Sequence, residues 1–188
     1  QVNHIHPKAG LKAPAVRGVT ILTSLDEDTL RNDLKIEKSI PSMVRFLAEN
    51  AKAAGVYVVS AAGNRNLSQV DYPANASAVW AVSAVDATSR KASFASYGSD
   101  VDFVAPGLDL LGAHPRAPSG LARWSGTSFS TALVTGAFAL LRGDDAASPS
   151  KDLFERLEDT AVPVDALNPL YAGKLGKGRL DLGAATAP

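Results

Sequence analysis

The chain of 188 residues contains no cysteine. Disulfide bonds, thiolate catalysis and cysteine-ligated zinc are therefore excluded. This absence does not identify a compartment, because cysteine-free chains occur in oxidising and reducing surroundings alike. The first ten residues, QVNHIHPKAG, also lack the basic segment and apolar run of a signal peptide, although one could have been removed.

An excess of charge of either sign is missing too. Lys and Arg together number 19, as do Asp and Glu, so the formal net charge is zero. This balance removes the electrostatic argument for nucleic acid or an anionic membrane as the main partner. Charges of mixed sign are densest over residues 26–38, where we expect a surface insertion. The length predicts one domain over residues 1–188.

One stretch is long enough to be tested as a membrane span. Residues 124–141 are 18 in number and uncharged, but six of them are Ser or Thr, and glycine interrupts the run. A buried helix over 128–141 explains the stretch better, because its apolar residues leave no wholly polar face. We therefore predict no membrane span.

Short β-prone runs alternate with helical patterns along the rest of the chain. Buried strands interleaved with helices predict an α/β protein with a largely parallel sheet. The segment 110–124 carries turn signals at its centre and is expected to form a hairpin or a long loop. Predicted strands cover 18–25, 56–59, 79–85 and 101–107, and predicted helices cover 40–54, 128–141 and 148–159.

Two polar residues stand where reacting groups could be held. Ser128 follows the flexible Gly126 turn and falls in the first turn of the predicted helix, where free N–H groups favour a negative charge. It could serve as a nucleophile there, or Thr127 or Ser128 could merely cap the helix. Asn64 ends the most apolar strand, and its amide could donate to an oxyanion or simply occupy a turn.

Five segments in this order resemble the subtilisin-like serine proteases: VVSAAGN, YPANASAVWAVSAVD, VDFVAPG, SGTSFSTALVTGAFALL and GKGRLDLGAA. The resemblance implies a three-layer fold, with a mostly parallel sheet flanked by helices, and hydrolysis of polypeptides. It matches Ser128 to the nucleophile and Asn64 to the oxyanion-hole amide. The remaining matched positions would bind substrate: Ser24 and Leu25 along an extended strand, and Ala61, Ala62 and Gly63 as one pocket wall.

The chain also departs from the family pattern. Ala132 and Leu133 replace a Pro-His pair, which is a mild change within a helix. The family's Asp-Ser/Thr-Gly and His-Gly-Thr motifs are absent, so the fold is expected to be incomplete at the N-terminal side, with the triad Asp and His outside these residues. The alternative is an inactive pseudoprotease that binds peptides or acts as a scaffold. An esterase is disfavoured because no Gly-x-Ser-x-Gly is present.

The three histidines do not form a recognisable catalytic or metal site. His4 and His6 could form a metal pair but lack a third ligand, and His114 is expected in a loop. No cofactor is required. The resemblance implies weakly bound calcium or sodium near Ala74, Val79 and Asp102, a cis proline at Tyr72-Pro73, and a secreted or cell-envelope location.

Overall fold

A computed structural model describes residues 20–21 and 40–187 of the chain. Within these residues, four parallel strands form a sheet in the order β1-β2-β3-β4. The β-branched and small residues of β2, β3 and β4 are mostly buried, as a parallel sheet covered on both faces requires. The strands are β1 (Thr20–Ile21), β2 (Val58–Ala61), β3 (Val79–Val85) and β4 (Val101–Pro106).

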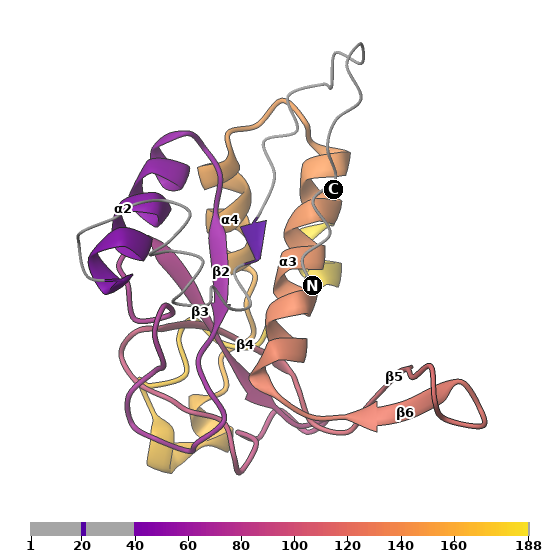
Figure 1. The fold of residues 1–188 in the computed structure, drawn as a ribbon. Helices are drawn as coiled ribbons and strands as arrows, with labels where there is room; N and C mark the ends of the chain where they lie inside the picture. The colour runs from indigo at the N-terminus through magenta and orange to yellow at the C-terminus, as the bar shows by residue number, and fades with distance from the viewer. Residues whose placement is uncertain (1–19, 22–39, 188) are drawn as a thin grey trace.

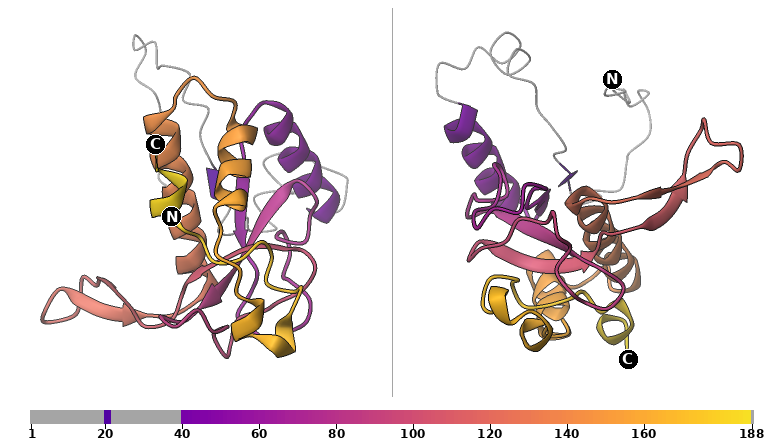
Figure 2. Two further views of the ribbon diagram at one scale, coloured as in Figure 1. Left: turned by 180° about the vertical axis from the view of Figure 1, so that it is seen from behind. Right: turned by 90° about the horizontal axis from the view of Figure 1, so that it is seen from below.

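Helices cover both faces of this sheet, so the fold has three layers. Helix α2 (Ile40–Ala53) packs Ala48 against β2 and β3 on one face. Helices α3 (Thr127–Asp144) and α4 (Ser150–Asp159) pack on the opposite face. Figure 2 shows α2 and α3 on opposite sides of the strands. The predicted α/β class, with a mostly parallel sheet flanked by helices, is confirmed.

Aromatic stacking holds α4 against the sheet and α3. Phe154 of α4 is fully buried, and its ring centroid lies 4.5 Å from those of Tyr57 and Phe138 and 4.4 Å from that of Trp80. Val134 and Leu141 of α3 complete the same core cluster. Helix α3 is therefore fixed to the sheet by one face. Its opposite face is exposed at Leu133 (42%) and Leu140 (59%), so the prediction of a helix buried on all sides is wrong. Nothing in the described part of the chain is a helix capable of crossing a membrane.

An antiparallel hairpin projects from the body between β4 and α3 (Figure 1). It consists of β5 (Leu110–Ala113) and β6 (Leu121–Trp124), so the hairpin alternative is confirmed and the long loop is not. After α4 the chain forms two short 3-10 helices and a final turn of helix, namely η1 (Asp165–Leu167), η2 (Pro169–Tyr171) and α5 (Leu182–Ala185).

Some sequence predictions concern residues that the structure does not describe. The expected insertion at 26–38 and the proposed substrate-strand residues Ser24 and Leu25 lie outside the described residues. Of the predicted strand 18–25, the described part is β1, which pairs in parallel with β2. The peptide bond between Tyr72 and Pro73 is cis, as predicted.

Candidate active site

The site forms where the end of β2 meets the start of α3. Gly126 precedes the helix with φ 155°, a backbone conformation that side-chain-bearing residues resist. Its N–H donates to the carbonyl of Gly107, at 2.8 Å, which fixes the turn to the end of β4. The turn therefore delivers the first residues of α3 to the same edge of the sheet as Asn64.

Asn64 and Thr127 are joined by two hydrogen bonds. The Thr127 backbone N–H donates to Asn64 Oδ1 at 2.9 Å, and the Thr127 hydroxyl donates to the same oxygen at 3.0 Å. The Thr127 hydroxyl also accepts the Gly63 N–H at 3.3 Å. Because Oδ1 is held by these two donors, the amide nitrogen Nδ2 is oriented as a free donor, and no described acceptor binds it.

Thr127 was not singled out from the sequence as a site residue. It is fully buried and directly precedes Ser128, so its hydroxyl turns inward while the next hydroxyl turns outward. The residue type was a signal, because a threonine hydroxyl can donate one hydrogen bond and accept another. Nothing in the local pattern, however, indicated a partner 63 residues away.

Ser128 lies exposed in the first turn of α3. The helix cap is Gly126, and no side chain caps the helix, so the alternative in which Thr127 or Ser128 is a simple cap is wrong. Within the described residues, neither the Ser128 hydroxyl nor its backbone N–H makes a hydrogen bond. A free hydroxyl beside free N–H groups at a helix N-terminus is suited to a reaction that develops negative charge.

The residues predicted as a pocket wall have different environments. The Ala62 side chain is buried in the core, and its carbonyl accepts the Asp71 N–H at 2.8 Å. Ala61 is partly exposed, and Gly63 has φ 109°, which favours glycine. A side chain on Gly63 would overlap the Asp71 carboxylate. Because Gly63 has no side chain, the Asp71 carboxylate can pack against the backbone directly before Asn64.

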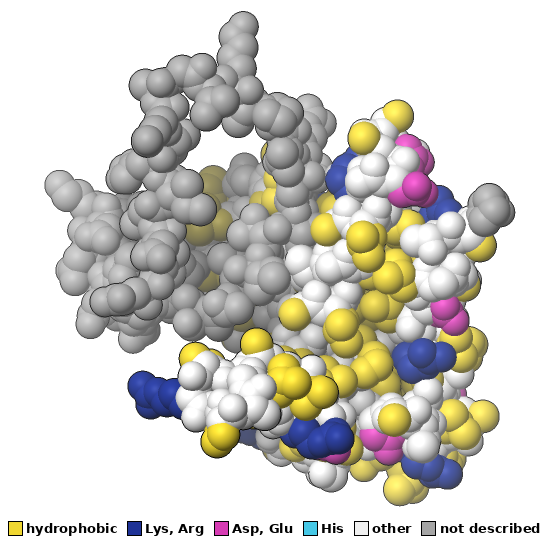
Figure 3. Space-filling view, turned by 90° about the vertical axis from the view of Figure 1, so that its right-hand side faces the viewer, with side chains coloured by type: hydrophobic (Ala, Val, Ile, Leu, Met, Phe, Trp, Pro, Cys, Tyr) yellow, Lys and Arg dark blue, Asp and Glu magenta, His cyan; other side chains and the backbone are white. Residues whose placement is uncertain are grey.

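An apolar cavity of about 390 Å³ lies on the hairpin side of Ser128. Hydrophobic side chains gather on the hairpin and on the surface beside it (Figure 3). Phe129, which follows Ser128, forms part of the wall and stacks on Trp124 of β6, with ring centroids 5.8 Å apart. The other lining residues are Leu110, Leu111, Gly112, Ala113, Ala132 and Leu133.

His114 is the histidine that falls within the described residues, and it lies in the turn of the hairpin as expected. Its Nδ1 accepts the Arg116 N–H at 3.1 Å, and its ring stacks on Trp124 at 5.3 Å. These contacts give it a structural role in the turn. His4 and His6 lie outside the described residues.

The proposed cation position offers few oxygen ligands. Asp102 Oδ2 accepts the Ala81 N–H at 2.7 Å, and burial raises the pKa of Asp102 to about 6. Ala74 and Val79 could contribute only backbone carbonyls. No group of three metal-ligating side chains occurs in the described ranges. Ca²⁺ takes 6–8 oxygen ligands, so a single carboxylate with one oxygen already hydrogen-bonded is a weak donor set. The cation stays a prediction.

Comparison with known proteins decides the family. The model of the subtilase family, Peptidase_S8, matches residues 27–180, which is most of the chain. The chain belongs to the subtilase family. The curated relatives of this subtilase chain include Subtilisin BL of Lederbergia lenta, which is 35% identical over 155 residues, or 82% of this chain and 55% of that protein.

Solved structures agree with this membership. The patellamide maturation protease PatA aligns with a TM-score of 0.69 and 32% identity, over 78% of this chain and 56% of PatA. A protease from Pseudoalteromonas arctica aligns with a TM-score of 0.67 and 26% identity, over 78% of this chain and 47% of that chain. The subtilase chain therefore spans about half the length of the relatives it matches, and these residues correspond to the C-terminal part of the domain.

Proposed function

We propose that this subtilase chain is the nucleophile-bearing part of a serine endopeptidase. Ser128 Oγ attacks the carbonyl carbon of a peptide bond, and the carbonyl oxygen becomes an oxyanion. Asn64 Nδ2 and the Ser128 backbone N–H donate to that oxyanion. The imidazole that takes the serine proton, and the carboxylate that orients it, come from outside the described residues.

One observation carries the proposal: Thr127 holds Asn64 by its Oδ1. An asparagine fixed at its oxygen presents its two N–H donors, and only donors stabilise an oxyanion. The same threonine is the first residue of α3, so the amide and the Ser128 hydroxyl are positioned by one rigid turn. A turn asparagine or a helix cap would need neither this pairing nor an exposed serine.

The proposed substrate-binding residues are supported by family membership and by the position of β1 in the sheet. Strand β1 lies at the edge of the described sheet, and the sequence that follows it contains Ser24 and Leu25. We propose that a peptide pairs along this segment in extended form, with Ala61 to Gly63 as one wall of the pocket for the side chain that precedes the cut. A secreted or cell-envelope location is proposed on family membership alone.

Hydrolysis by the full encoded protein tests the proposal. An internally quenched peptide library should be cleaved by the wild type and by Ser77→Ala, which removes an exposed serine before β3. Ser128→Ala should reduce cleavage to background, because no other nucleophile replaces it. A folded full-length protein that binds peptides without cleaving them would instead support the pseudoprotease alternative.

A further inference from the structure

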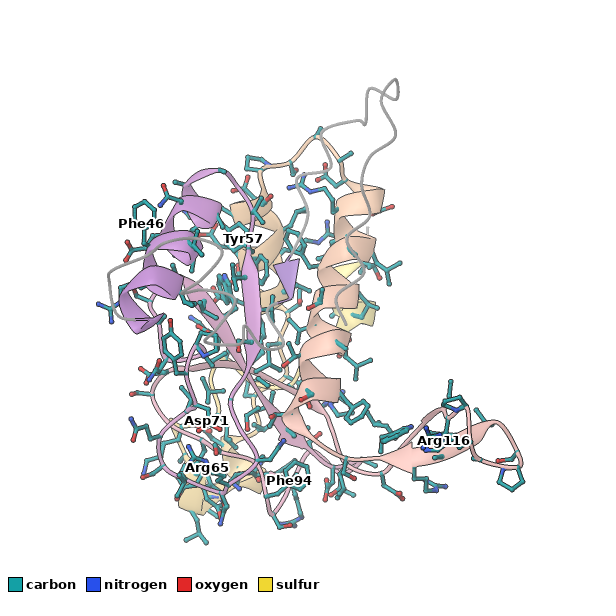
Figure 4. All side chains as sticks on the ribbon, in the orientation of Figure 1. Phe46, Tyr57, Arg65, Asp71, Phe94 and Arg116 are labelled. Atoms are coloured by element: carbon teal, nitrogen blue, oxygen red, sulfur yellow. The ribbon has the colours of Figure 1, made fainter. Side chains whose placement is uncertain are left out.

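An ion pair lies directly beside the proposed oxyanion site. Arg65 follows Asn64, and its guanidinium pairs with Asp71 Oδ1 across the loop after β2. Figure 4 labels both side chains on this loop. The other carboxylate oxygen, Asp71 Oδ2, occupies the space that a Cβ on Gly63 would need. The carboxylate therefore lies against the backbone of the proposed pocket wall, one residue from Asn64.

The first half of the loop that carries this pair is held to a neighbouring part of the chain. The Ser96 N–H donates to the Gly63 carbonyl at 2.9 Å, and the Asn66 N–H donates to the Phe94 carbonyl at 2.7 Å. The Asn66 side chain also accepts the Lys91 ammonium at 2.8 Å. The partner residues of these bonds all lie in the segment 91–96. At the other end, the Asp71 N–H donates to the Ala62 carbonyl at 2.8 Å, which ties Asp71 to the wall itself, as a specificity-determining group needs.

The two members of the pair are fixed to different degrees. The Asp71 side chain is 32% exposed, whereas that of Arg65 is 67% exposed. An exposed pair with a long, flexible arginine gains little, since holding that side chain costs entropy and water screens the charges. In the described part of the chain, Arg65 is the only cation paired with Asp71. A second cation entering from the pocket can therefore replace Arg65 while Asp71 stays in position.

We infer that Asp71 makes the pocket selective for a lysine or arginine side chain immediately before the cleaved bond. The entering cation pairs with Asp71, and Arg65 turns out into water. This inference rests on the proposed function, since it concerns the same site. Two other outcomes are physically distinct: Arg65 could attract an acidic side chain, or the pair could fill the pocket and admit only small residues.

Two peptidyl diphenyl phosphonates distinguish these outcomes. The probes share every group except the one at the position before the phosphorus, which is a lysine-like side chain in one and an uncharged side chain of equal length in the other. Each probe loses phenoxide when Ser128 Oγ bonds to phosphorus. The rate of labelling, measured by intact mass on the full encoded protein, reports selectivity directly.

The wild type should be labelled about 10- to 100-fold faster by the basic probe, as expected for one added charge-assisted contact. Asp71→Asn should abolish most of this preference, and a circular dichroism spectrum that matches the wild type shows that the variant is folded. Arg65→Gln should increase the rate with the basic probe. The control is Glu155→Gln, which neutralises a carboxylate in an exposed ion pair on α4 and should keep the preference.

Equal rates in the wild type, or a preference that survives Asp71→Asn, would overturn the inference. So would faster labelling by a third probe with an acidic or a methyl side chain. A small fluorophosphonate distinguishes a failure of the pocket selectivity from a failure of the nucleophile. If it labels Ser128 while the basic preference is absent, only the inference fails. If it does not label the folded protein, the proposed function fails and the inference fails with it.

Discussion

At the scale of single residues, the site depends on which atom of Asn64 is free. The amide oxygen is bound by Thr127, so the nitrogen is available to donate. An amide that is fixed before the reaction begins stabilises a developing charge without reorganising, which is why such donors contribute strongly to turnover. Substitutions at each member of this pair test the arrangement.

Removing the Asn64 amide should reduce kcat and leave KM nearly unchanged. We expect Asn64→Ala to lose about 10²- to 10³-fold in kcat, the range measured for the oxyanion-hole asparagine of subtilisin itself. Asn64→Asp should lose more, because a carboxylate repels the oxyanion. Steady-state kinetics on one peptide substrate checks both variants. A loss confined to KM would contradict the assignment, since it would indicate ground-state binding only.

Thr127 should behave as a positioning residue. Thr127→Val removes the hydroxyl that donates to Asn64, and we expect a loss of roughly 10-fold in kcat because the amide is then held by one bond instead of two. Thr127→Ser keeps the hydroxyl and should restore most of the activity. A purely structural role would reduce thermal stability and leave kcat per folded molecule unchanged, so both quantities are measured.

At the scale of elements, α3 and α4 are held to the sheet by one aromatic cluster. Phe154→Ala should destabilise the protein by about 3–5 kcal/mol, the usual cost of truncating a fully buried phenylalanine. Urea denaturation followed by tryptophan fluorescence measures it, since Trp80 stacks on Phe154. Phe154→Leu keeps most of the volume and should lose much less. Equal losses in the two variants would show that the cluster is not close-packed.

These elements also show what the sequence could predict. The parallel strands and the presence of α3 were predictable because their apolar patterns are local. The burial of α3 was overestimated, since apolar residues such as Leu140 lie on its exposed face. The pairing of Asn64 with Thr127 was not predictable, because it joins positions 63 residues apart and depends on how the Gly126 turn meets β2. Cap assignment failed for a similar reason, since the Thr127 hydroxyl bonds outside its own helix.

At the scale of the whole molecule, burial of Asp102 should make stability depend on pH. Its pKa is raised from 3.8 to about 6, chiefly by burial, so the folded protein binds this proton more tightly than the unfolded chain. The resulting stabilisation is complete below pH 3.8 and is lost as the pH rises through about 6. The maximum difference is about 3 kcal/mol, since each tenfold change in proton affinity corresponds to about 1.4 kcal/mol.

Asp102→Asn should remove this pH dependence. The substitution keeps an acceptor for the Ala81 N–H but cannot ionise. Urea denaturation between pH 4 and 7 in the presence of EDTA, which excludes bound calcium, gives the free energy of unfolding for both proteins. Relative to the wild type, the variant should gain stability as the pH rises. Parallel curves for the two proteins would show that the Asp102 carboxylate is not buried as described.

Covalent labelling measures whether the fold activates Ser128 Oγ above the other hydroxyl groups of the protein. The full encoded protein is treated with a fluorophosphonate, digested, and mapped by mass spectrometry. We expect one phosphonylated peptide with the adduct on Ser128, and no adduct in Ser128→Ala. A correctly folded protein that remains unlabelled, or one that carries the adduct on another serine, would contradict it.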